Sequence, residues 1–293
     1  MRPWRLFLLL AILLAASAPA DARMHYPARG HRIMPASAAP LDGFTAPSGA
    51  YSFRKLKSTY AGPAIRIRRA SDNLETDINF LSCTGFTGCP WDEAAAIAHC
   101  AATSCFVKTM YDQSGLGFDM TMATVGNQPS LVFNCWGALP CAQVNNNTFF
   151  LQAASRATTS PVSISGVAER TGGTGTCIFK AAAGANLLQG TNTVASQWTL
   201  AGTGTIVATA ADAARHSFIG VIDGTASSGF RVDAAETTGT VAVITTANVW
   251  QMQGGATPTV CRFGEEIVWS GYGLTPAERA ALRSNQRSFW GTP

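Results

Sequence analysis

The stretch Cys100-Ala-Ala-Thr-Ser-Cys-Phe-Val-Lys-Thr-Met-Tyr-Asp-Gln-Ser-Gly115 holds the most informative features of this sequence. Its two cysteines lie close enough in the chain to close a short disulfide loop. The run from Phe106 to Met110 predicts a strand, and the Asp-Gln-Ser-Gly residues after it are typical of a tight turn. The stretch therefore predicts a strand held between an oxidised loop and a turn.

This stretch resembles the catalytic domain of secreted α-L-arabinofuranosidase B enzymes. In that family a short disulfide loop leads into a buried strand and then into a Tyr-Asp-Gln-Ser-Gly turn. The resemblance extends through Tyr51 to Asp77, where Arg66-Ile-Arg-Arg-Ala-Ser-Asp72 matches the family's basic strand and Ser-Asp turn. It implies a concanavalin A-like fold and a carbohydrate-active protein, whose relatives release terminal α-L-arabinofuranosyl groups from plant polysaccharides.

The rest of the chain is typical of an all-β protein. Only 13% of the residues are charged, and short apolar runs recur between Gly, Thr and Asn turns. We expect a disulfide-stapled, concanavalin A-like antiparallel β-sandwich (jelly roll) with a few short helices over residues 47–293. The expected strands after residue 128 are 130–133, 162–168, 176–181, 197–200, 205–210, 217–222, 229–233, 241–245 and 263–269.

Three segments are predicted to be helical. Phe53, Leu56 and Tyr60 lie on one helical stripe, which predicts a helix over residues 50–60 that ends before Gly62-Pro63. Residues 92–99 predict a second, short helix. The third begins after Thr275, with Pro276 in its first turn and Glu278 able to reach back, and is expected to turn Ala281, Leu282 and Phe289 to the core.

The N-terminus predicts export. Residues 1–22 have a short basic region, an apolar run too short to span a bilayer, and a small-residue cleavage site near Ala22. Residues 23–46, rich in Pro, Ala and Gly, predict a flexible leader. We therefore expect a secreted or periplasmic bacterial protein with no membrane span. The formal net charge is only +4, so we expect no nucleic-acid partner.

Eight cysteines in an exported chain predict four disulfides. Proximity favours Cys83 with Cys89, Cys100 with Cys105, Cys135 with Cys141, and the distant Cys177 with Cys261. Proximity does not decide among the about 105 pairings that eight cysteines allow. Zinc is the rival interpretation, but the cysteines form no Cys-x-x-Cys pair and the histidines are scattered, so no metal site is predicted.

The family resemblance also implies two catalytic carboxylates, and neither is found at its aligned position. A retaining glycosidase uses one carboxylate as the nucleophile and one as the acid/base. The family's acid follows a Gly-Gly pair, but Gly254-Gly255 is followed here by Ala256. No Asp or Glu occurs between Glu169 and Asp212, where the nucleophile strand is expected. Residues 203–206 occupy the nearest matching place.

A few other carboxylates could replace the missing pair. They are Asp223, Asp233, Glu236, Glu265 and Glu266. We take Glu265, Glu266 and Asp223 as the catalytic candidates. Adjacent strand residues face opposite ways, so one of the two glutamates is expected to point inward, where burial would raise its pKa for use as an acid. The alternatives are an ion pair with Arg262 or another base for the glutamates, and a turn-capping role for Asp223.

Substrate-binding candidates are Trp136, Gly254 and Gly255. Trp136 follows Cys135 in a predicted loop and is expected to be an exposed platform for a sugar ring, whereas Trp91, Trp198 and Trp250 are more often core residues. The segment from Asp112 to Asp119 alternates oxygen donors with glycines. Calcium binding is conceivable there, but we favour a turn held by Asp112 and Ser114 and predict no cofactor.

Two functions fit these residues. One is a divergent secreted glycoside hydrolase resembling α-L-arabinofuranosidase B, which acts on arabinofuranosyl-containing polysaccharide with relocated carboxylates. The other is a catalytically inactive, lectin-like glycan-binding or adhesive module. Polysaccharide is the expected partner in both cases, and the sequence defines neither the natural glycan nor the oligomeric state.

Overall fold

The structure is a computed structural model that describes residues 39–82, 88–145, 148–172, 177–182, 185–191, 197–201, 204–210, 213–224, 228–241, 247–248, 250–254 and 260–293. Antiparallel strands dominate this part of the chain, and only two α-helices occur in it. The helices are α1 (Glu93–His99) and α2 (Pro276–Trp290), and a 3-10 turn covers Val125–Asn127. The strands are β1 (Gly49–Ser52), β2 (Ile65–Arg69), β3 (Glu75–Ile78), β4 (Cys105–Met110), β5 (Met120–Thr121), β6 (Ser130–Val132), β7 (Cys141–Val144), β8 (Phe150–Gln152), β9 (Arg156–Ala157), β10 (Val162–Gly172), β11 (Cys177–Ala182), β12 (Ala185–Thr191), β13 (Gln197–Ala201), β14 (Thr205–Ala210), β15 (Arg215–Ile222), β16 (Ser228–Val232), β17 (Ala235–Gly239), β18 (Ala247–Asn248), β19 (Gln251–Gly254) and β20 (Val260–Ser270).

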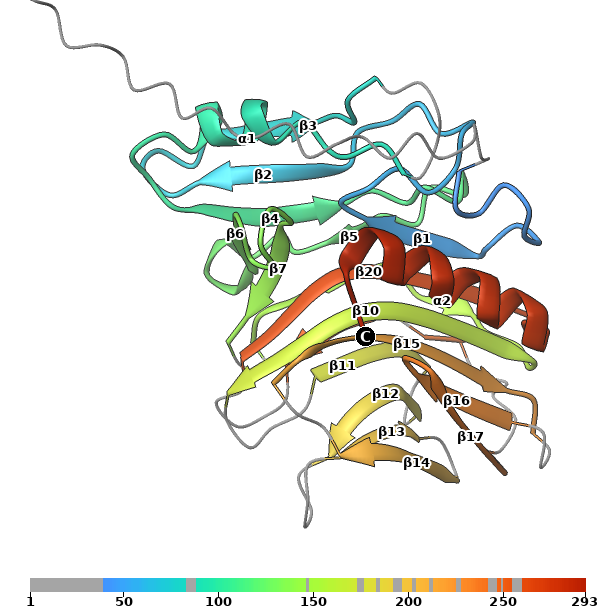
Figure 1. Ribbon diagram of the computed structural model, residues 1–293. Coiled ribbons are helices and arrows are strands. Elements are labelled where there is room, and N and C mark those ends of the chain that lie inside the picture. The colour runs from blue at the N-terminus through green and yellow to red at the C-terminus, as the bar shows by residue number, and fades with distance from the viewer. Residues whose placement is uncertain are drawn as a thin grey trace, which may run out of the picture. The chain divides into compact units, whose positions relative to one another are not determined.

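Two antiparallel layers form the sandwich (Figure 1). One layer has the order β1-β20-β10-β15-β16-β17, and the other has the order β8-β19-β11-β12-β13-β14. A further set of strands, β3-β2-β4-β6-β7, joins the first layer through the pairing of β7 with β20. The predicted all-β sandwich is thus confirmed.

Aromatic and aliphatic side chains from facing strands fill the space between the layers. The Phe179 ring on β11 lies 5.1 Å from that of Phe263 on β20, and the Trp198 ring on β13 lies 4.5 Å from that of Phe218 on β15. Gly166 on β10 leaves room for Phe179, because a Cβ there would lie 2.6 Å from its ring. Burial of these apolar surfaces is the main force that holds the two layers together.

The predicted disulfides join the strands as proximity suggested. Cys100–Cys105 and Cys135–Cys141 close short loops, and Cys177–Cys261 links β11 to β20 across the sandwich. Cys89 is also disulfide-bonded. Its expected partner, Cys83, lies outside the described residues.

The helix predicted over residues 50–60 is wrong. Tyr51 and Ser52 belong to β1, which pairs with β20 in antiparallel register. Phe53 and Leu56 are buried, as a helical stripe would also require. Their spacing therefore could not distinguish a helix from a short strand followed by an irregular segment, and pairing with β20 decided the outcome.

The strands predicted from apolar runs match β6, β10, β11, β13, β14, β15, β16 and β20 within a few residues at each end. The strand predicted over 241–245 lies largely outside the described residues. Strands β12, β17 and β19 were not predicted. Gln189, Glu236 and Gln251 are among their polar residues, which concealed the alternation that a half-buried strand shows.

The other two predicted helices are confirmed. Asp92 caps α1 by accepting a hydrogen bond from the Ala95 amide at 3.0 Å. Helix α2 packs on the outer face of the first layer (Figure 1). Its buried stripe is Leu282, Gln286 and Trp290, whereas Ala281 is exposed and Phe289 is half-buried. The predicted core face of α2 was therefore only partly right.

A capping box starts α2, and its loss should be measurable. The Glu278 amide donates to Thr275 Oγ1 at 3.3 Å, and the Thr275 amide donates to Glu278 Oε2 at 2.7 Å. We expect Thr275→Ala to lower the free energy of unfolding by about 1 kcal/mol, and Thr275→Ser to retain most of it. Urea denaturation checks this, and equal losses in both variants would contradict a capping role.

The packed part of the chain begins earlier than residue 47. Leu41 is fully buried in a cluster with Trp269 and Leu282, and its amide donates to the Leu56 carbonyl at 2.9 Å. The proposed signal segment, residues 1–22, lies outside the described residues. No helix among the described residues is both long and apolar enough to cross a bilayer.

Candidate functional site

Glu265, the first catalytic candidate, is completely buried under α2. It forms an ion pair with Arg54, whose Nε lies 2.7 Å from Glu265 Oε2 and whose Nη2 lies 3.0 Å from Oε1. Gln286 and Trp290 of α2 donate to the same carboxylate at 3.0 and 3.1 Å. Burial would raise the pKa of Glu265, but the charge of Arg54 and these hydrogen bonds outweigh burial and lower it. The ion-pair alternative is therefore the one observed, with Arg54 in place of Arg262.

Glu266, its neighbour on β20, is also completely buried. Neither of its carboxylate oxygens has a hydrogen-bond partner within the described part of the chain. Burial alone raises its pKa well above the ordinary value, because burial disfavours the charged form. The two glutamates face opposite ways, as adjacent strand residues should, but both are buried because α2 covers the outer face of β20 and the second layer covers the inner face.

Asp223 lies in the turn after β15 and is half-buried. Its carboxylate accepts a hydrogen bond from the Ser228 hydroxyl at 2.8 Å, and its amide donates to Ser228 Oγ at 3.2 Å. These contacts favour the turn-stabilising alternative. Glu236 is likewise engaged, because Arg231 on β16 and Arg279 on α2 both pair with it.

Trp136 is not the exposed platform that we expected. Its indole N–H donates to Glu169, its ring meets that of Trp290 edge-on at 5.7 Å, and the Arg215 guanidinium lies 5.3 Å from its ring centroid. The ring is half-buried as a result. Trp91, Trp198 and Trp250 are core residues, as their type predicted.

The Asp112 turn uses both oxygens of its carboxylate for local hydrogen bonds. Asp112 Oδ1 accepts from the amides of Ala50 and Ser114 at 3.0 and 2.8 Å, and Oδ2 accepts from the Ser114 hydroxyl at 2.6 Å and the Phe118 amide at 3.1 Å. The turn interpretation is thus observed directly.

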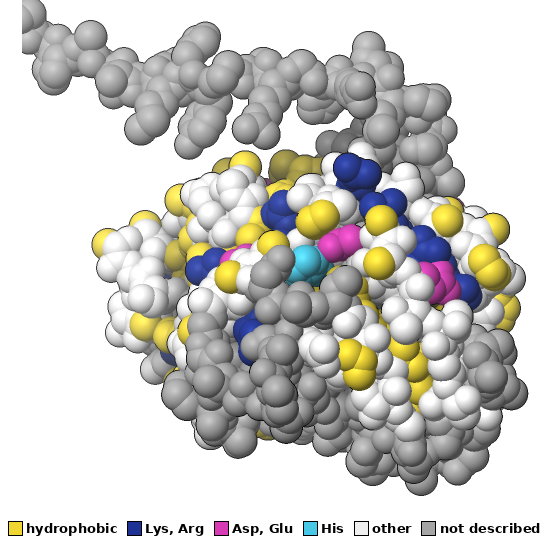
Figure 2. Space-filling view, turned by 60° about the horizontal axis from the view of Figure 1, so that its bottom comes forward, with side chains coloured by type: hydrophobic (Ala, Val, Ile, Leu, Met, Phe, Trp, Pro, Cys, Tyr) yellow, Lys and Arg dark blue, Asp and Glu magenta, His cyan; other side chains and the backbone are white. Residues whose placement is uncertain are grey.

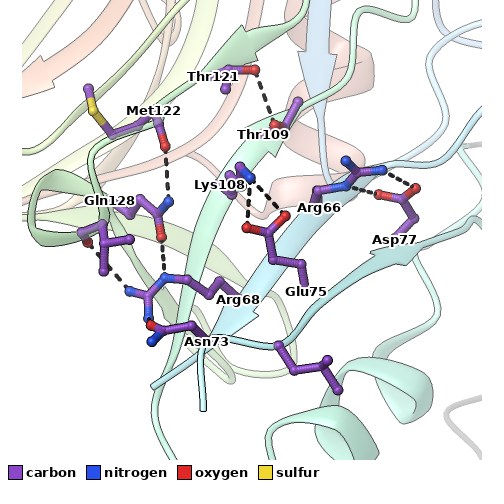
Figure 3. Close-up of polar contacts among 12 residues, drawn as sticks. Arg66, Arg68, Asn73, Glu75, Asp77, Lys108, Thr109, Thr121, Met122 and Gln128 are labelled. Atoms are coloured by element: carbon purple, nitrogen blue, oxygen red, sulfur yellow. Dashed lines mark hydrogen bonds and ion pairs between the residues drawn. The ribbon is translucent and has the colours of Figure 1, made fainter. Parts of the chain in front are cut away.

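The basic strand matched by the resemblance is β2, and its arginines have partners (Figure 3). Arg66 forms a bidentate pair with Asp77 at 2.7 and 2.8 Å. Arg68 is buried and donates to Gln128 at 2.7 Å and to Asn73 at 2.8 Å. An exposed pair such as Arg66 with Asp77 contributes little to stability, about 0–1 kcal/mol. Together, the contacts of these arginines leave little unpaired positive charge on this face.

A polar cluster lies on β15 and after β16. Asp233 was named as a possible replacement carboxylate, but its pairing with His216 was not predicted. His216 Nδ1 is 2.5 Å from Asp233 Oδ2, and Asp233 Oδ1 accepts from the Ser217 amide at 3.0 Å. Trp198 packs edge-on against the His216 ring with centroids 5.7 Å apart. Because Asp233 holds Nδ1, it fixes the orientation of the imidazole, an arrangement found where a histidine acts on a ligand. The available signal was that His216 directly precedes the predicted strand 217–222 and Asp233 ends the predicted strand 229–233.

Strand register and a disulfide connect this cluster to Gly254, the first of the predicted glycine pair. His216 stands opposite Ala168 on β10, and Cys261 stands opposite Arg170, two residues further along. The two residues lie on opposite sides of β10, so they are about 7 Å apart along the strands and two strand spacings, about 10 Å, apart across the sheet. Cys261 is bonded to Cys177, and Cys177 pairs with Gly254 on β19. We call this area the His216–Gly254 region. It consists of His216, Asp233, the Cys177–Cys261 disulfide and Gly254.

Gly255 and Ala256, the positions of the predicted second substrate-binding glycine and of the missing acid, lie outside the described residues. So does Thr203. Figure 2 shows a histidine beside an acidic side chain near the middle of one face, with basic and hydrophobic side chains around them. Such a mixture of polar and apolar groups is suited to a sugar, which presents both hydroxyl groups and C–H patches.

Comparison with solved structures identifies the fold. Among solved structures, a GH54 α-L-arabinofuranosidase mutant soaked with 4-nitrophenyl α-L-arabinofuranoside is similar with a TM-score of 0.62 and 16% identity, over 82% of this chain and 62% of that one. An arabinofuranosidase complexed with arabinofuranosyl-α-1,2-xylobiose is similar with a TM-score of 0.57 and 17% identity, over 81% of this chain and 61% of that one. At these identities the likeness shows the shared sandwich fold.

Sequence comparison then points to one family. Residues 42–166 match the family model described as α-L-arabinofuranosidase B, catalytic. α-L-Arabinofuranosidase B of Emericella nidulans is 42% identical over 73 residues, which are 25% of this chain and 14% of the relative. The α-L-arabinofuranosidase of Hypocrea jecorina is 41% identical over 73 residues, which are again 25% of this chain and 14% of the relative. The matched segment thus spans about a seventh of these relatives, and over it the resemblance to the α-L-arabinofuranosidase B catalytic domain is confirmed.

Proposed function

We propose that this chain recognises arabinofuranosyl-containing polysaccharide, and that recognition rather than hydrolysis is its main activity. The preference for recognition over hydrolysis rests on one observation. Each carboxylate that was considered for catalysis is buried, ion-paired or held in a turn. A retaining glycosidase needs two carboxyl groups about 5–5.5 Å apart that both face the substrate. Glu265 and Glu266 have no exposed surface from which to reach a sugar.

The His216–Gly254 region is the proposed binding site. The His216 imidazole is oriented by Asp233 and is largely buried. Gly254 lets a ligand approach the backbone closely because it has no side chain. The Cys177–Cys261 disulfide fixes the two layers relative to each other at this point. A site held this firmly loses little conformational entropy when a sugar binds.

We also propose that the protein works outside the cytoplasm, secreted or in the periplasm of a bacterium after cleavage near Ala22. Disulfides such as Cys100–Cys105 and Cys135–Cys141 form and persist in oxidising compartments. This agrees with a polysaccharide partner, which the cell exterior supplies.

A divergent glycoside hydrolase is the second candidate function. The match of residues 42–166 to a catalytic-domain family favours it. If hydrolysis occurs, the His216–Asp233 pair is the proposed proton-transfer group, because Asp233 can stabilise the charged imidazole while the leaving oxygen is protonated. Water would then add to the anomeric carbon as the glycosidic C–O bond breaks.

The test separates the two functions. We expect the protein to be retarded in native gels that contain arabinan and to migrate freely in gels that contain a β-glucan, and we expect no arabinose to be released from 4-nitrophenyl α-L-arabinofuranoside. Retardation with arabinose release would support the hydrolase. Free migration in arabinan would contradict recognition.

The site is tested by substitution at the same time. We expect Asp233→Asn and His216→Ala to weaken arabinan binding about tenfold, which corresponds to about 1.4 kcal/mol. Ile97→Ala is the matched control, because Ile97 is an exposed residue of α1 outside the proposed site. Unchanged binding in folded His216 and Asp233 variants would exclude this region.

A further inference from the structure

An apolar pocket of about 210 Å³ lies where the segment before α1, the Cys135–Cys141 loop and the end of α2 meet. Its lining includes Phe53, Trp91, Glu93, Leu139, Pro140 and Phe289. None of these residues belongs to the His216–Gly254 region. The pocket therefore calls for an explanation separate from that of the proposed glycan site.

The walls of this pocket are held in place by short-range contacts. The Trp91 amide donates to the Phe53 carbonyl at 3.1 Å, and the two rings meet edge-on at 5.4 Å. On the opposite side, the Leu139 carbonyl accepts from the Trp136 amide at 3.1 Å inside a loop closed by the Cys135–Cys141 disulfide. The cavity is thus formed before any ligand arrives, which is typical of small-molecule sites.

One carboxylate oxygen of a residue that lines the pocket is unsatisfied. Glu93 Oε1 is buried and has no hydrogen-bond partner among the described residues. Burial raises the pKa of Glu93, which means that its charged form lacks stabilisation in the free protein. A buried acceptor without a donor costs free energy, so a ligand that supplies the donor gains that free energy on binding. This feature indicates what kind of ligand the pocket takes.

The charges of the residues that line the pocket indicate what charge its ligand carries. Its lining contains two carboxylates, Asp92 and Glu93, and no basic residue. Asp92 already caps α1 through the Ala95 amide, so Glu93 is the group left to meet a ligand. Phe289 already packs against one cation on its ring, since the Arg54 guanidinium lies 4.8 Å from the centroid. Glu265 compensates the charge of Arg54.

We propose that this pocket binds the ammonium group of a small organic cation, with Glu93 as the counter-ion and Trp91 and Phe289 as aromatic walls. Carboxylate and aromatic side chains together recognise ammonium groups through charge-assisted hydrogen bonds and cation–π attraction. The apolar remainder of the lining accommodates the carbon body of the ligand. This activity is independent of glycan recognition.

Titration with two ligands of the same shape tests the proposal. Benzylamine is a cation at neutral pH, and benzyl alcohol is its neutral counterpart. We expect benzylamine to bind one site per chain at least about tenfold more tightly, the difference typical of a hydrogen bond to a charged group. Chemical-shift changes in labelled protein give both affinities. Equal affinities, or no binding of benzylamine, would overturn the proposal.

Two variants locate the site. Glu93→Gln keeps the shape and removes the charge, so it should abolish the preference for benzylamine, whereas Glu75→Gln, in an exposed pair with Lys108, should leave it intact. Leu139→Trp should fill the cavity and weaken both ligands in a protein that keeps its cooperative unfolding. A preference that survives in folded Glu93→Gln, or unchanged affinities for both ligands in folded Leu139→Trp, would refute the assignment.

Discussion

Replacing Glu265 with alanine is expected to lower the free energy of unfolding by about 3–5 kcal/mol, because it leaves the buried Arg54 guanidinium without a counter-ion. Arg54 is fully buried, and its other hydrogen-bond partner, Asn285, is neutral and contacts Nη1 at 2.6 Å. The substitution also removes the acceptor shared by Gln286 and Trp290. Three segments far apart in the chain, the one just after β1, strand β20 and helix α2, would lose their common contact.

Urea denaturation at neutral pH measures this loss, and a double-mutant cycle assigns it. Arg54→Met alone should also destabilise the protein, since it leaves Glu265 buried and unpaired. The double variant Arg54→Met with Glu265→Ala should lose less than the two single losses combined, because no buried charge remains. Additive losses would show that the pair does not act as a unit.

The sandwich could be predicted because its signals are local. Apolar runs between turn residues marked β10, β14 and β20, and Thr275-Pro276 with Glu278 marked the start of α2. Disulfide partners close in the chain were equally accessible. The segment after Gly49 was mispredicted because its fold depends on β20, more than 200 residues later, and no local pattern carries that information.

The candidate site was less accessible to sequence for the same reason. Whether Glu265 and Glu266 reach solvent depends on what covers each face of β20, and α2 covers one face only after the chain has folded. The His216–Asp233 pair depends on the register of β15 with β16. The sequence thus showed which residues have side chains capable of catalysis. The packing decided which of those side chains can reach a substrate.

Replacing Glu266 with glutamine is expected to stabilise the protein increasingly as pH rises. The two neighbours on β20 are both buried, yet the pKa of Glu265 is lowered and that of Glu266 is raised, because only Glu265 has a cationic partner. A group whose pKa is raised on folding contributes its stability fully below its unfolded pKa, here near the ordinary value of 4.5. That stability is lost as pH rises toward the folded pKa.

The free energy of unfolding of the wild type and of Glu266→Gln, determined at several pH values, measures this effect. Above pH 4.5, the wild-type free energy of unfolding should fall relative to Glu266→Gln by about 1.4 kcal/mol per pH unit, until the folded pKa is reached. The comparison isolates Glu266, because Glu265 acts with the opposite sign in both proteins: its stability is lost as pH falls. Glu75→Gln, in an exposed ion pair, should follow the wild type. If Glu266→Gln also follows it between pH 5 and 8, then Glu266 has an ionised state that the folded protein stabilises.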